Sequence, residues 1–542
     1  MSNSFGRYSA EQKRNRTETP QTRMTPGRTD EVKNSAGGFT FKVDDKTRLE
    51  RFLMLGSDKG SYYASERKLT GENVKFVNEM VNKNERLVVD TTVDISVNGR
   101  AAKNSPALFT MATVMAKGKD KAYARAALPK VARTPTHLFE YAQYIDDLAG
   151  WGRAKRQSVA DWYESKDVDR LAYGVVKYRQ RNGWTHRDLF RLAHPKNVDE
   201  SIVKFVLNGT VGVDAPNVIE GFAKVQAAKN VDDVLRALND YPVLPWEAIP
   251  TQFLKEAKVW QTLFYQGSIP QTALLRNVKR FAKIGAFKDM MFAGEVAKRL
   301  ADTEQIRKGR VHPVAYLNAL YIYTKGELIR EKNSYWSSST RRKDWDTNPK
   351  IAGALEDGFN NAFGNVVPSN KRTMVSIDTS ASMTWEGPAG LVGLDCREAA
   401  AAMAMVLVRT EPYVTVNAFS TSLTDAGISD RDSLETVMRK IDRMPAGGTD
   451  CAQPMLHAAK HGIDVDTFTV WTDNETWAGR VKPYQALKQY RDKTGLQSRL
   501  AVVGMVANDF TIADPTDSGM LDFTGFDSGA LRVLADFSAG RM

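Results

Sequence analysis

One short stretch in the last third of the chain, SIDTSASM (376–383), has the residue types for chemistry. It carries a carboxylate and two hydroxyls at alternate positions, Asp378, Ser380 and Ser382. The preceding run TMVSI (373–377) is rich in apolar residues and is typical of a buried strand. Taken alone, the stretch allows three interpretations: a serine nucleophile, the cap of a helix, or oxygen ligands of a metal ion.

Two further loops of the same region carry matching oxygen atoms. Thr449 follows two glycines in GGTD, and Asp473 ends the strand-like segment DTFTVWTD (466–473). Two carboxylates and three hydroxyls are hard ligands of limited negative charge, which suit Mg²⁺. In this order they form the pattern of a metal-ion-dependent adhesion site in a von Willebrand factor A-like domain. We therefore predict a divalent cation, Mg²⁺, bound by Asp378, Ser380, Ser382, Thr449 and Asp473.

The alternatives are weaker on the same residues. A nucleophilic serine needs a general base, and His457 and His461 stand one helical turn apart in the segment after GGTD. No G-x-S-x-G turn surrounds Ser380 or Ser382, and HAAKH lacks the glutamate of a zincin-type site. The helix-cap interpretation of the two serines stays open.

The elements around these loops alternate between strand and helix after residue 370. Strand-like runs lie at 373–377, 413–420, 466–473 and 499–507, and helix-prone runs lie at 397–410, 433–444, 452–462, 483–493 and 529–537. This alternation predicts an α/β doubly wound, mostly parallel sheet. Ligands of such sheets bind in loops beyond the carboxyl ends of the strands, where the candidate ligands stand.

The region before residue 365 has a helical pattern. Apolar residues recur every three or four positions in 72–81, 231–240 and 272–285, while strand-like alternation is confined to FTFKV (39–43) and ERLVVDTTVDIS (85–96). Many short amphipathic helices in series predict an all-α helical-repeat solenoid. Residues 1–36 contain few large apolar residues, so we expect a disordered basic arm there.

Charge divides the chain in the same place. The whole chain has a net charge of +12, but residues 371–542 hold 17 Lys and Arg against 22 Asp and Glu. The positive charge therefore belongs to the first part, which points to a polyanion such as nucleic acid as its partner. Two cysteines without C-x-x-C spacing, no secretory signal and no long apolar run predict a cytoplasmic protein with no membrane span.

The most concentrated basic segment is KYRQRNGWTHRDLFRLAHPK (177–196). Lys177 and Arg181 are four residues apart, which on a helix would place them on one face, where like charges repel unless a polyanion neutralises them. Arg153, Lys155 and Arg156 add a second cluster nearby. A solvated face with Trp184 in the core is the alternative for this stretch alone.

Several segments carry a resemblance to a known family. SAGGFTFKV, RTPTHLFEYAQYIDDL, KYRQRNGWTHRDLFRLAHPK, PAGGTDCAQPM and WTDNETWAG all resemble the Ro autoantigen (TROVE-domain) family, from about residue 36 to the C-terminus. The compact chain is similar to bacterial members. The resemblance implies a HEAT-like helical-repeat ring over 37–368, a von Willebrand factor A-like domain over 369–542, and residues 1–36 outside both.

The resemblance also implies a function. Family members bind small noncoding Y-like RNA on the outer basic surface of the ring and single-stranded 3′ ends of misfolded or immature RNA inside it. They act with exoribonucleases in RNA quality control, ribosomal RNA maturation or decay. Lys177, Arg181 and His194 match the family's RNA-binding positions, and the five oxygen ligands match its divalent-cation site. We expect a monomeric, non-catalytic RNA-binding scaffold.

Two rivals belong to other classes. In the first, the von Willebrand factor A-like domain captures a partner's carboxylate through the metal ion, and RNA binding is secondary. In the second, the chain is a Mg²⁺-dependent nuclease, but that chemistry usually needs two metal ions and more carboxylates than this site offers.

Overall fold

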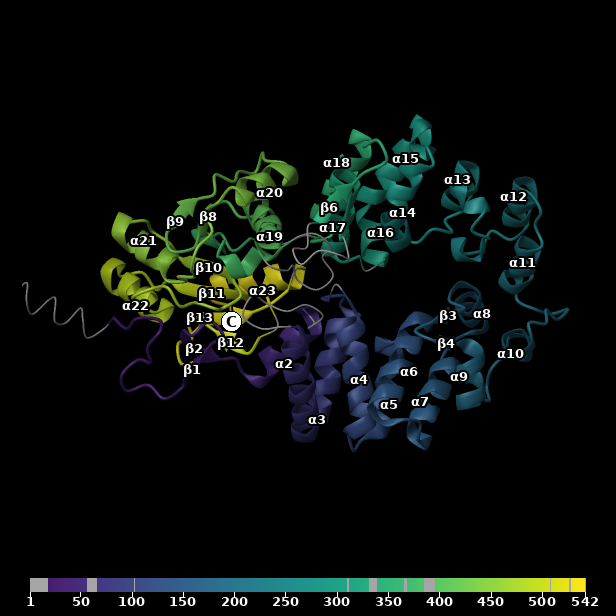
Figure 1. Cartoon of the computed structure of the whole chain (residues 1–542), viewed down its shortest axis with the longest axis horizontal. Coiled ribbons are helices and arrows are strands. Elements are labelled where there is room, and N and C mark those ends of the chain that lie inside the picture. The colour runs from purple at the N-terminus through teal and green to yellow at the C-terminus, as the bar shows by residue number, and fades with distance from the viewer. Residues whose placement is uncertain are drawn as a thin grey trace, which may run out of the picture. The chain divides into compact units, whose positions relative to one another are not determined.

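The computed structural model describes residues 18–55, 66–101, 103–309, 311–330, 339–364, 368–384, 395–506, 508–525 and 528–541 (Figure 1). Two compact units make up the chain. The first combines residues 1–74, 100–103 and 363–542, and the second combines residues 75–99 and 104–362. None of the helices in the described ranges combines the length and hydrophobicity needed to cross a bilayer.

A six-stranded sheet in the order β13-β11-β10-β7-β8-β9 forms the centre of the first unit. All neighbours are parallel except β8 and β9, which confirms the predicted mostly parallel sheet. The strands are β7 (Thr373–Asp378), β8 (Val414–Phe419), β9 (Leu423–Asp425), β10 (Thr467–Thr472), β11 (Arg499–Gly504) and β13 (Met520–Phe523).

Helices connect these strands, as the alternating pattern predicts. They are η4 (Ala381–Thr384), α19 (Cys396–Thr410), α20 (Leu434–Asp442), α21 (Gln453–His461), α22 (Pro483–Thr494) and α23 (Ser528–Ser538). Phe468 and Val470, two residues apart on β10, join the core cluster of α21 and α22. Because side chains alternate along a strand, the residues between them point to the other face of the sheet.

The N-terminal residues belong to this unit, which differs from the predicted arm over 1–36. Strands β1 (Glu31–Lys33) and β2 (Phe39–Lys42) pair antiparallel, and β2 pairs with β12 (Phe510–Thr511) near the other end of the chain (Figure 1). Helix α2 (Asp45–Leu55) follows, and its fully buried Arg51 donates two 2.5 Å hydrogen bonds to Asp522. Partners more than 400 residues away order this segment, and no local sequence pattern reveals them. Residues 1–17 lie outside the described residues.

Helices make up nearly all of the second unit. Helix α3 (Glu66–Val97) leads into it, and the others are α4 (Ser105–Lys117), α5 (Lys121–Val131), α6 (Pro135–Ala149), α7 (Arg153–Glu164), α8 (Val168–Lys177), α9 (His186–Ala193), α10 (Glu200–Asn208), α11 (Asn217–Gln226), α12 (Val231–Asp240), η1 (Trp246–Ala248), η2 (Phe253–Lys255), α13 (Ala257–Tyr265), α14 (Gln271–Lys283), η3 (Ala286–Lys288), α15 (Met290–Ala301), α16 (Thr303–Lys308), α17 (Pro313–Lys325) and α18 (Pro349–Asn361).

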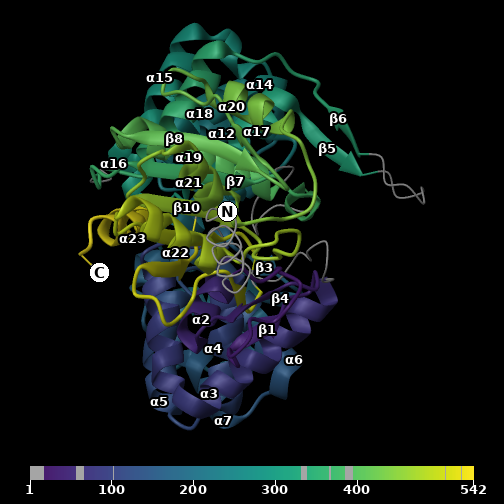
Figure 2. The same ribbon diagram turned by 90° about the vertical axis from the view of Figure 1, so that its left-hand side faces the viewer.

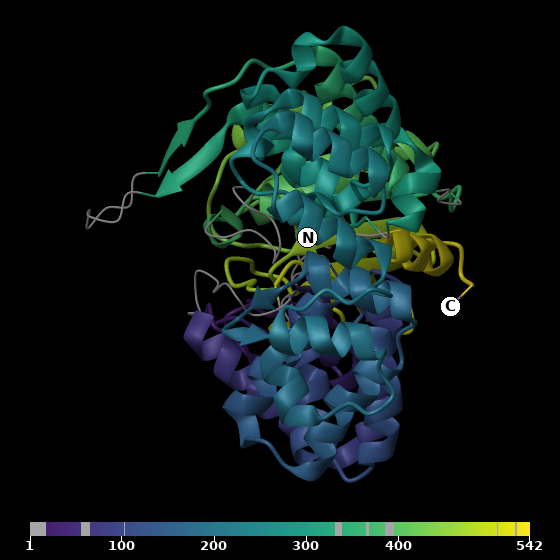
Figure 3. The same cartoon turned by 90° about the vertical axis from the view of Figure 1, so that its right-hand side faces the viewer.

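Consecutive helices of this unit pack on one another or on near neighbours, for example α4 on α6 and α15 on α18 (Figure 1). Two hairpins interrupt the series, β3 (Gln180–Arg181) with β4 (Trp184–Thr185) and β5 (Glu327–Arg330) with β6 (Ser339–Arg342). The β5–β6 hairpin extends away from the helices in both side views (Figures 2 and 3). The helical character is as predicted, and closure into a ring stays a prediction.

The strand-like alternation at 85–96 is misleading, since these residues lie in α3. Val88, Thr92 and Ile95, which are spaced for one face of a helix, are buried, and the Thr92 hydroxyl donates to the Val88 carbonyl one turn earlier at 2.6 Å. Packing of this face overrides the preference of β-branched residues for strands.

Candidate metal site and nucleic-acid interface

The three loops with the predicted metal ligands meet at the carboxyl edge of the sheet. Asp378 ends β7 and Asp473 follows β10, and these strands are parallel neighbours with Ile377 opposite Trp471. The Ala381 amide donates to the Gly447 carbonyl at 3.3 Å, which joins the first loop to the GGTD loop. The Trp477 amide donates to the Thr449 carbonyl at 3.0 Å, which joins the GGTD loop to the loop after β10.

Hydrogen bonds fix several of the candidate ligands. The Ser380 amide donates to Asp378 Oδ1 at 2.9 Å, and the Thr472 hydroxyl donates to Asp378 Oδ2 at 2.6 Å. The Ser380 and Ser382 hydroxyls are 3.0 Å apart. The sequence did not single out Thr472. This residue ends β10, directly before Asp473, and β10 is the parallel neighbour of β7, which places Thr472 beside Asp378.

Two oxygen atoms of the cluster are left without a partner. Thr449 Oγ1 and Asp473 Oδ2 are both buried and accept or donate no hydrogen bond among the described residues. Such orphaned buried polar atoms are costly unless a ligand or ion satisfies them. All five predicted residues are at most 6% exposed, and no Lys or Arg in the described part of the chain pairs with either carboxylate. The donor set therefore fits a hard divalent cation.

Burial and proximity shape the electrostatics here. Burial, with the nearby Asp473 charge as the second cause, raises the pKa of Asp378. Burial also raises the pKa of Asp473. Glu475, two residues on, is 1% exposed, and its pKa is raised by burial and by Asp473. Among the described residues, no Lys or Arg forms an ion pair with any of these three carboxyl groups.

The rival interpretations of the serines find little support. Asp395, with Glu398 in a capping box, caps α19, and Ser380 pairs with Ser382 instead. The His457 and His461 rings lie 4.4 Å apart on α21 and contact each other. No three-residue cluster of His, Cys, Asp and Glu suited to a metal ion occurs in the described residues, so hydroxyl ligands are essential to the candidate site.

The basic segment 177–196 is not one helix, which corrects the predicted shared face of Lys177 and Arg181. Helix α8 ends at Lys177, and Arg181 lies in β3 opposite Trp184 of β4. Asn182 and Gly183 form the turn, with φ of +50° and +77°. Asn-Gly is the strongest short-range hairpin signal, and it was present in the sequence.

Lys177 is enclosed by its surroundings. Its side chain is 7% exposed, and its Nζ lies 3.8 Å from Glu247 Oε1 and 5.3 Å and 5.2 Å from the Tyr173 and Tyr178 ring centres. Burial lowers its pKa, with Glu247 opposing that shift. Lys177 therefore supports the surface from beneath, whereas Arg181 and His194 are exposed.

The surface of the same segment carries a group of exposed cations. Within the described residues, none of them pairs with a carboxylate: Arg179, Arg181, Arg187, Arg191 and Lys196. We call these five the basic surface. His194, at the end of α9, adopts φ of +49° and caps the helix.

Two ring side chains of the segment have structural contacts. His186 is 3% exposed, its Nδ1 lies 2.8 Å from the Tyr163 hydroxyl, and burial lowers its pKa to about 3, so it is a neutral core residue. Trp184 is half-buried, 5.5 Å from the Trp151 ring, and donates to Gln143 at 3.2 Å. Its ring thus packs within the helical unit, while the residue stays partly exposed.

A cavity of about 810 Å³ lies in the second unit beside Tyr173 and Tyr178. Its walls include the cations Arg133, Lys166 and Arg170, the ring of Trp162 and one carboxylate, Asp169. Lys166 Nζ stands 4.7 Å from the centre of that ring. Cations with aromatic faces suit a nucleobase and its phosphate.

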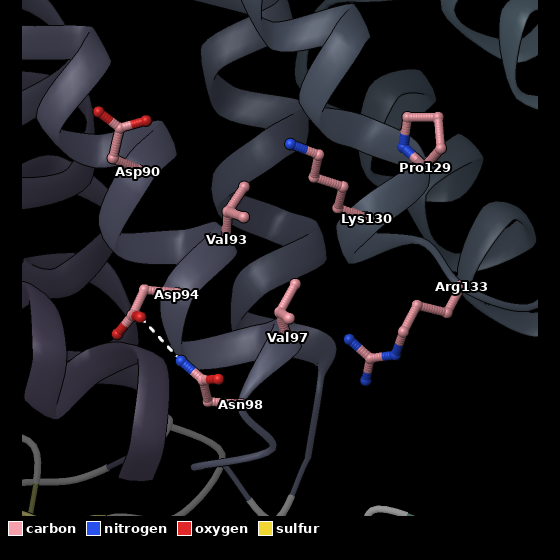
Figure 4. A pocket seen from close by; sticks show the side chains of 8 residues that line it. All are labelled: Asp90, Val93, Asp94, Val97, Asn98, Pro129, Lys130 and Arg133. Carbon is pink, nitrogen blue, oxygen red and sulfur yellow. Dashed lines mark hydrogen bonds between the residues drawn. The ribbon is translucent and has the colours of Figure 1, made fainter.

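A second cavity, of about 670 Å³, has mixed charge. It is lined by Asp90 and Asp94 of α3 and by Lys130 and Arg133, and Asp94 accepts a 2.8 Å hydrogen bond from Asn98 (Figure 4). The two carboxylates make it less suited to a polyanion.

Two family models together match most of the chain. The chain matches the Ro60 vWA domain over residues 372–538 and the TROVE domain over residues 32–231 and 244–332. It is 41% identical over 534 residues to RNA-binding protein RO60 of Deinococcus radiodurans, covering 96% of this chain and 98% of that protein. RNA-binding protein RO60 of Caenorhabditis elegans is 32% identical, and the match covers 94% of this chain and 90% of that protein.

Among solved structures, the crystal structure of the Deinococcus radiodurans RO (RSR) protein resembles this one with a TM-score of 0.67 and 39% identity. It covers 92% of this chain and 100% of that one. With a helical TROVE domain and a von Willebrand factor A domain in one chain, the protein belongs to the Ro60/TROVE family.

Proposed function

We propose that the chain is the RNA-binding scaffold of a Ro ribonucleoprotein and holds a small, structured, Y-like noncoding RNA on the basic surface. The observation that carries this proposal is the group of five exposed cations that pair with no carboxylate in the described part of the chain. Unpaired like charges within one short segment repel each other, and phosphates relieve that repulsion while releasing counterions. Both curated relatives bear the name RNA-binding protein.

Single-stranded RNA fits a different part of the second unit. In the cavity of about 810 Å³, Tyr173 and Tyr178 offer faces on which an unpaired base can stack. Lys166 and Arg170 offer charge for the adjoining phosphate. We assign to this unit the capture of 3′ ends of misfolded or precursor RNA, which would serve RNA quality control, ribosomal RNA maturation or decay by an exoribonuclease partner. No catalytic role is proposed for the chain.

The test compares binding of a structured small RNA across salt concentrations. Arg181 and Arg187 are replaced together by alanine in the full chain. Log affinity falls linearly with log salt concentration, and each lost phosphate contact should make this slope shallower by about 0.9. At 0.1 M salt, one lost contact corresponds to a decrease in affinity of about eightfold. The double variant should therefore bind about 60-fold more weakly if both residues contact phosphate.

Lys255→Ala with Lys258→Ala is the matched control, since both lysines are exposed and the same charge is removed. The salt dependence of RNA binding by the control variant should have nearly the same slope as that of the parent, with a difference much smaller than the change of about 0.9 expected for one lost phosphate contact. Equal slopes for the two double variants would show that only net charge matters, and the assignment of the basic surface would fail.

A second function is supported by the oxygen cluster of the first unit. We infer that it binds Mg²⁺ through Asp378, Ser380, Ser382, Thr449 and Asp473, since two of these side chains have orphaned oxygens. A bound Mg²⁺ would supply an open coordination position for a carboxylate of a protein partner. Mg²⁺ titration of the full chain by calorimetry tests this, and unchanged heat after Asp378→Ala would contradict it.

A further inference from the structure

The N-terminal strap, which we define as residues 18–44, lies against two of the loops that carry candidate metal ligands. Gln21 is fully buried; its Nε2 donates to Asp450 Oδ1 at 2.7 Å and to the Val481 carbonyl at 2.9 Å. Its Oε1 accepts a hydrogen bond from the Thr476 hydroxyl. One side chain of the strap therefore joins the residue after Thr449 to the loop that begins at Asp473.

Asn34 makes a second connection. It is 4% exposed, and its Nδ2 donates to the Thr476 carbonyl at 3.0 Å and to the Asn474 carbonyl at 3.3 Å. Its Oδ1 accepts from the Gly38 amide at 2.7 Å, so the same side chain also closes the turn of the strap. The neighbouring Ala36 amide donates to Glu475 at 3.0 Å.

The fit between strap and loop leaves no spare room. A Cβ added at Gly38 would lie 1.8 Å from the Thr476 carbonyl oxygen, and one added at Gly479 would lie 2.4 Å from both Asp450 and Gln21. Glu31 and Lys482 form an ion pair of 2.7 Å with side chains 0% and 2% exposed, which anchors the strap. Buried pairs of this kind are costly to break.

Thr476 transmits these contacts to the ligand loops. Its hydroxyl accepts from the Cys451 amide at 3.1 Å and lies 3.3 Å from the Thr449 carbonyl, while it donates to Gln21. The Trp477 and Ala478 amides donate to the same Thr449 carbonyl at 3.0 Å and 2.9 Å. The relative position of Thr449 and Asp473 thus depends on a network that the strap completes.

We propose that Gln21 and Asn34 are positioning residues for the divalent-cation site, and that docking of the strap sets its affinity. The proposal rests on the metal site proposed above. Residues that orient metal ligands from behind typically change metal affinity by about 10–100-fold when replaced. We expect a loss of at least about tenfold in affinity for Gln21→Ala and for Asn34→Ala.

The experiment measures Mn²⁺ binding to the full chain by electron paramagnetic resonance of free Mn²⁺. Thr476→Val, which keeps the shape but removes the hydroxyl, should lose affinity as Gln21→Ala does. Thr476→Ser, which loses a methyl group but keeps the hydroxyl, should retain the parent's affinity. Gln21→Ala combined with Thr476→Val should cost less than the sum of the two single changes, because both remove the hydrogen bond between Gln21 and Thr476. Arg23→Ala is the control on the strap, since this side chain is exposed.

The outcomes separate the two proposals. If the parent binds no Mn²⁺, or binds it equally after Asp378→Ala, the metal site itself is wrong. If the parent binds Mn²⁺ through Asp378 but Gln21→Ala, Asn34→Ala and Thr476→Val bind it equally well, the site stands and the positioning role of the strap is overturned. Circular dichroism and melting of each variant check that the fold is retained, and the affinity of any one of the three that stays folded decides the question.

Discussion

Replacement of Asp473 by asparagine should have opposite effects on stability with and without metal. Asp473 Oδ1 accepts a 3.0 Å hydrogen bond from the Glu475 amide, while Oδ2 is buried without a partner. Its charge also contributes to the raised pKa of Asp378. Without metal the substitution removes an uncompensated charge from beside a second one, and an asparagine oxygen can keep the Glu475 contact.

Leaving a polar group buried and unsatisfied costs about 1–3 kcal/mol, and more when it is charged. In EDTA, Asp473→Asn should recover that cost and raise the melting temperature of the first unit by a few degrees, at about 2–4 °C per kcal/mol. Mg²⁺ at a hundred times its dissociation constant should stabilise the parent by about 2.7 kcal/mol. The variant should show no such shift.

Differential scanning calorimetry of the full chain in EDTA and in Mg²⁺ gives all four melting temperatures. Glu435 lies in the first turn of α20, and Glu435→Gln serves as the control because it also removes one negative charge from the first unit. A variant that is less stable than the parent in EDTA, or that responds to Mg²⁺ as the parent does, would refute the reasoning.

Three further predictions concern the second unit. Lys177→Ala should destabilise it by about 1–3 kcal/mol because the half-buried Glu247 loses the cation that lies 3.8 Å away, whereas Arg181→Ala should leave its melting temperature unchanged; equal melting of the two variants would contradict this. Gly183→Ala should weaken RNA binding although no charge is lost, because the φ of +77° costs an L-residue about 1 kcal/mol. Gly212→Ala is the control and should leave RNA binding unchanged, since Gly212 has open space around it and no positive φ. His186, whose pKa is lowered to about 3 from an unfolded value of 6.5, stabilises the fold above pH 6.5 and loses that contribution as the pH falls towards 3. The full loss is about 5 kcal/mol, and urea unfolding of His186→Phe should show a flatter dependence on pH between 6.5 and 3 than the parent does.

The sheet of the first unit was predictable from the sequence because strands and helices there follow local patterns. Strands β7 and β10 are buried along their whole length, and the loops that follow them can meet only where parallel strands end. The five candidate ligands could therefore be chosen before the structure was known. Their hydrogen-bond partners could be inferred only in part, since Thr472 is adjacent in sequence but its contact with Asp378 depends on the register of two strands.

The errors have a common physical cause. Residues 18–36 lack a local apolar pattern, yet Gln21 and Glu31 find buried partners at Asp450 and Lys482. Residues 85–96 alternate like a strand but pack as one face of α3. Contacts between residues far apart in the chain decide both cases, and a sequence window cannot contain them.

Lys177 and Arg181 illustrate a different limit. The spacing of four residues suggested one helix face. In the structure, however, Arg181 pairs with Trp184 in a hairpin whose turn is Asn182-Gly183. In this case the local signal was present and charge spacing was given too much weight. The functional consequence is that Arg181 faces solvent while Lys177 supports the surface from within.

The most direct test of the central claim is to map where RNA crosslinks to the chain. The full-length protein is purified with its bound RNA, irradiated with ultraviolet light and digested, and the crosslinked peptides are identified by mass spectrometry. The basic surface predicts crosslinks within residues 177–196, with Trp184 among the modified residues and loss of the signal in Arg181→Ala with Arg187→Ala. Crosslinks confined to residues 369–542, or a protein that carries no RNA, would contradict it.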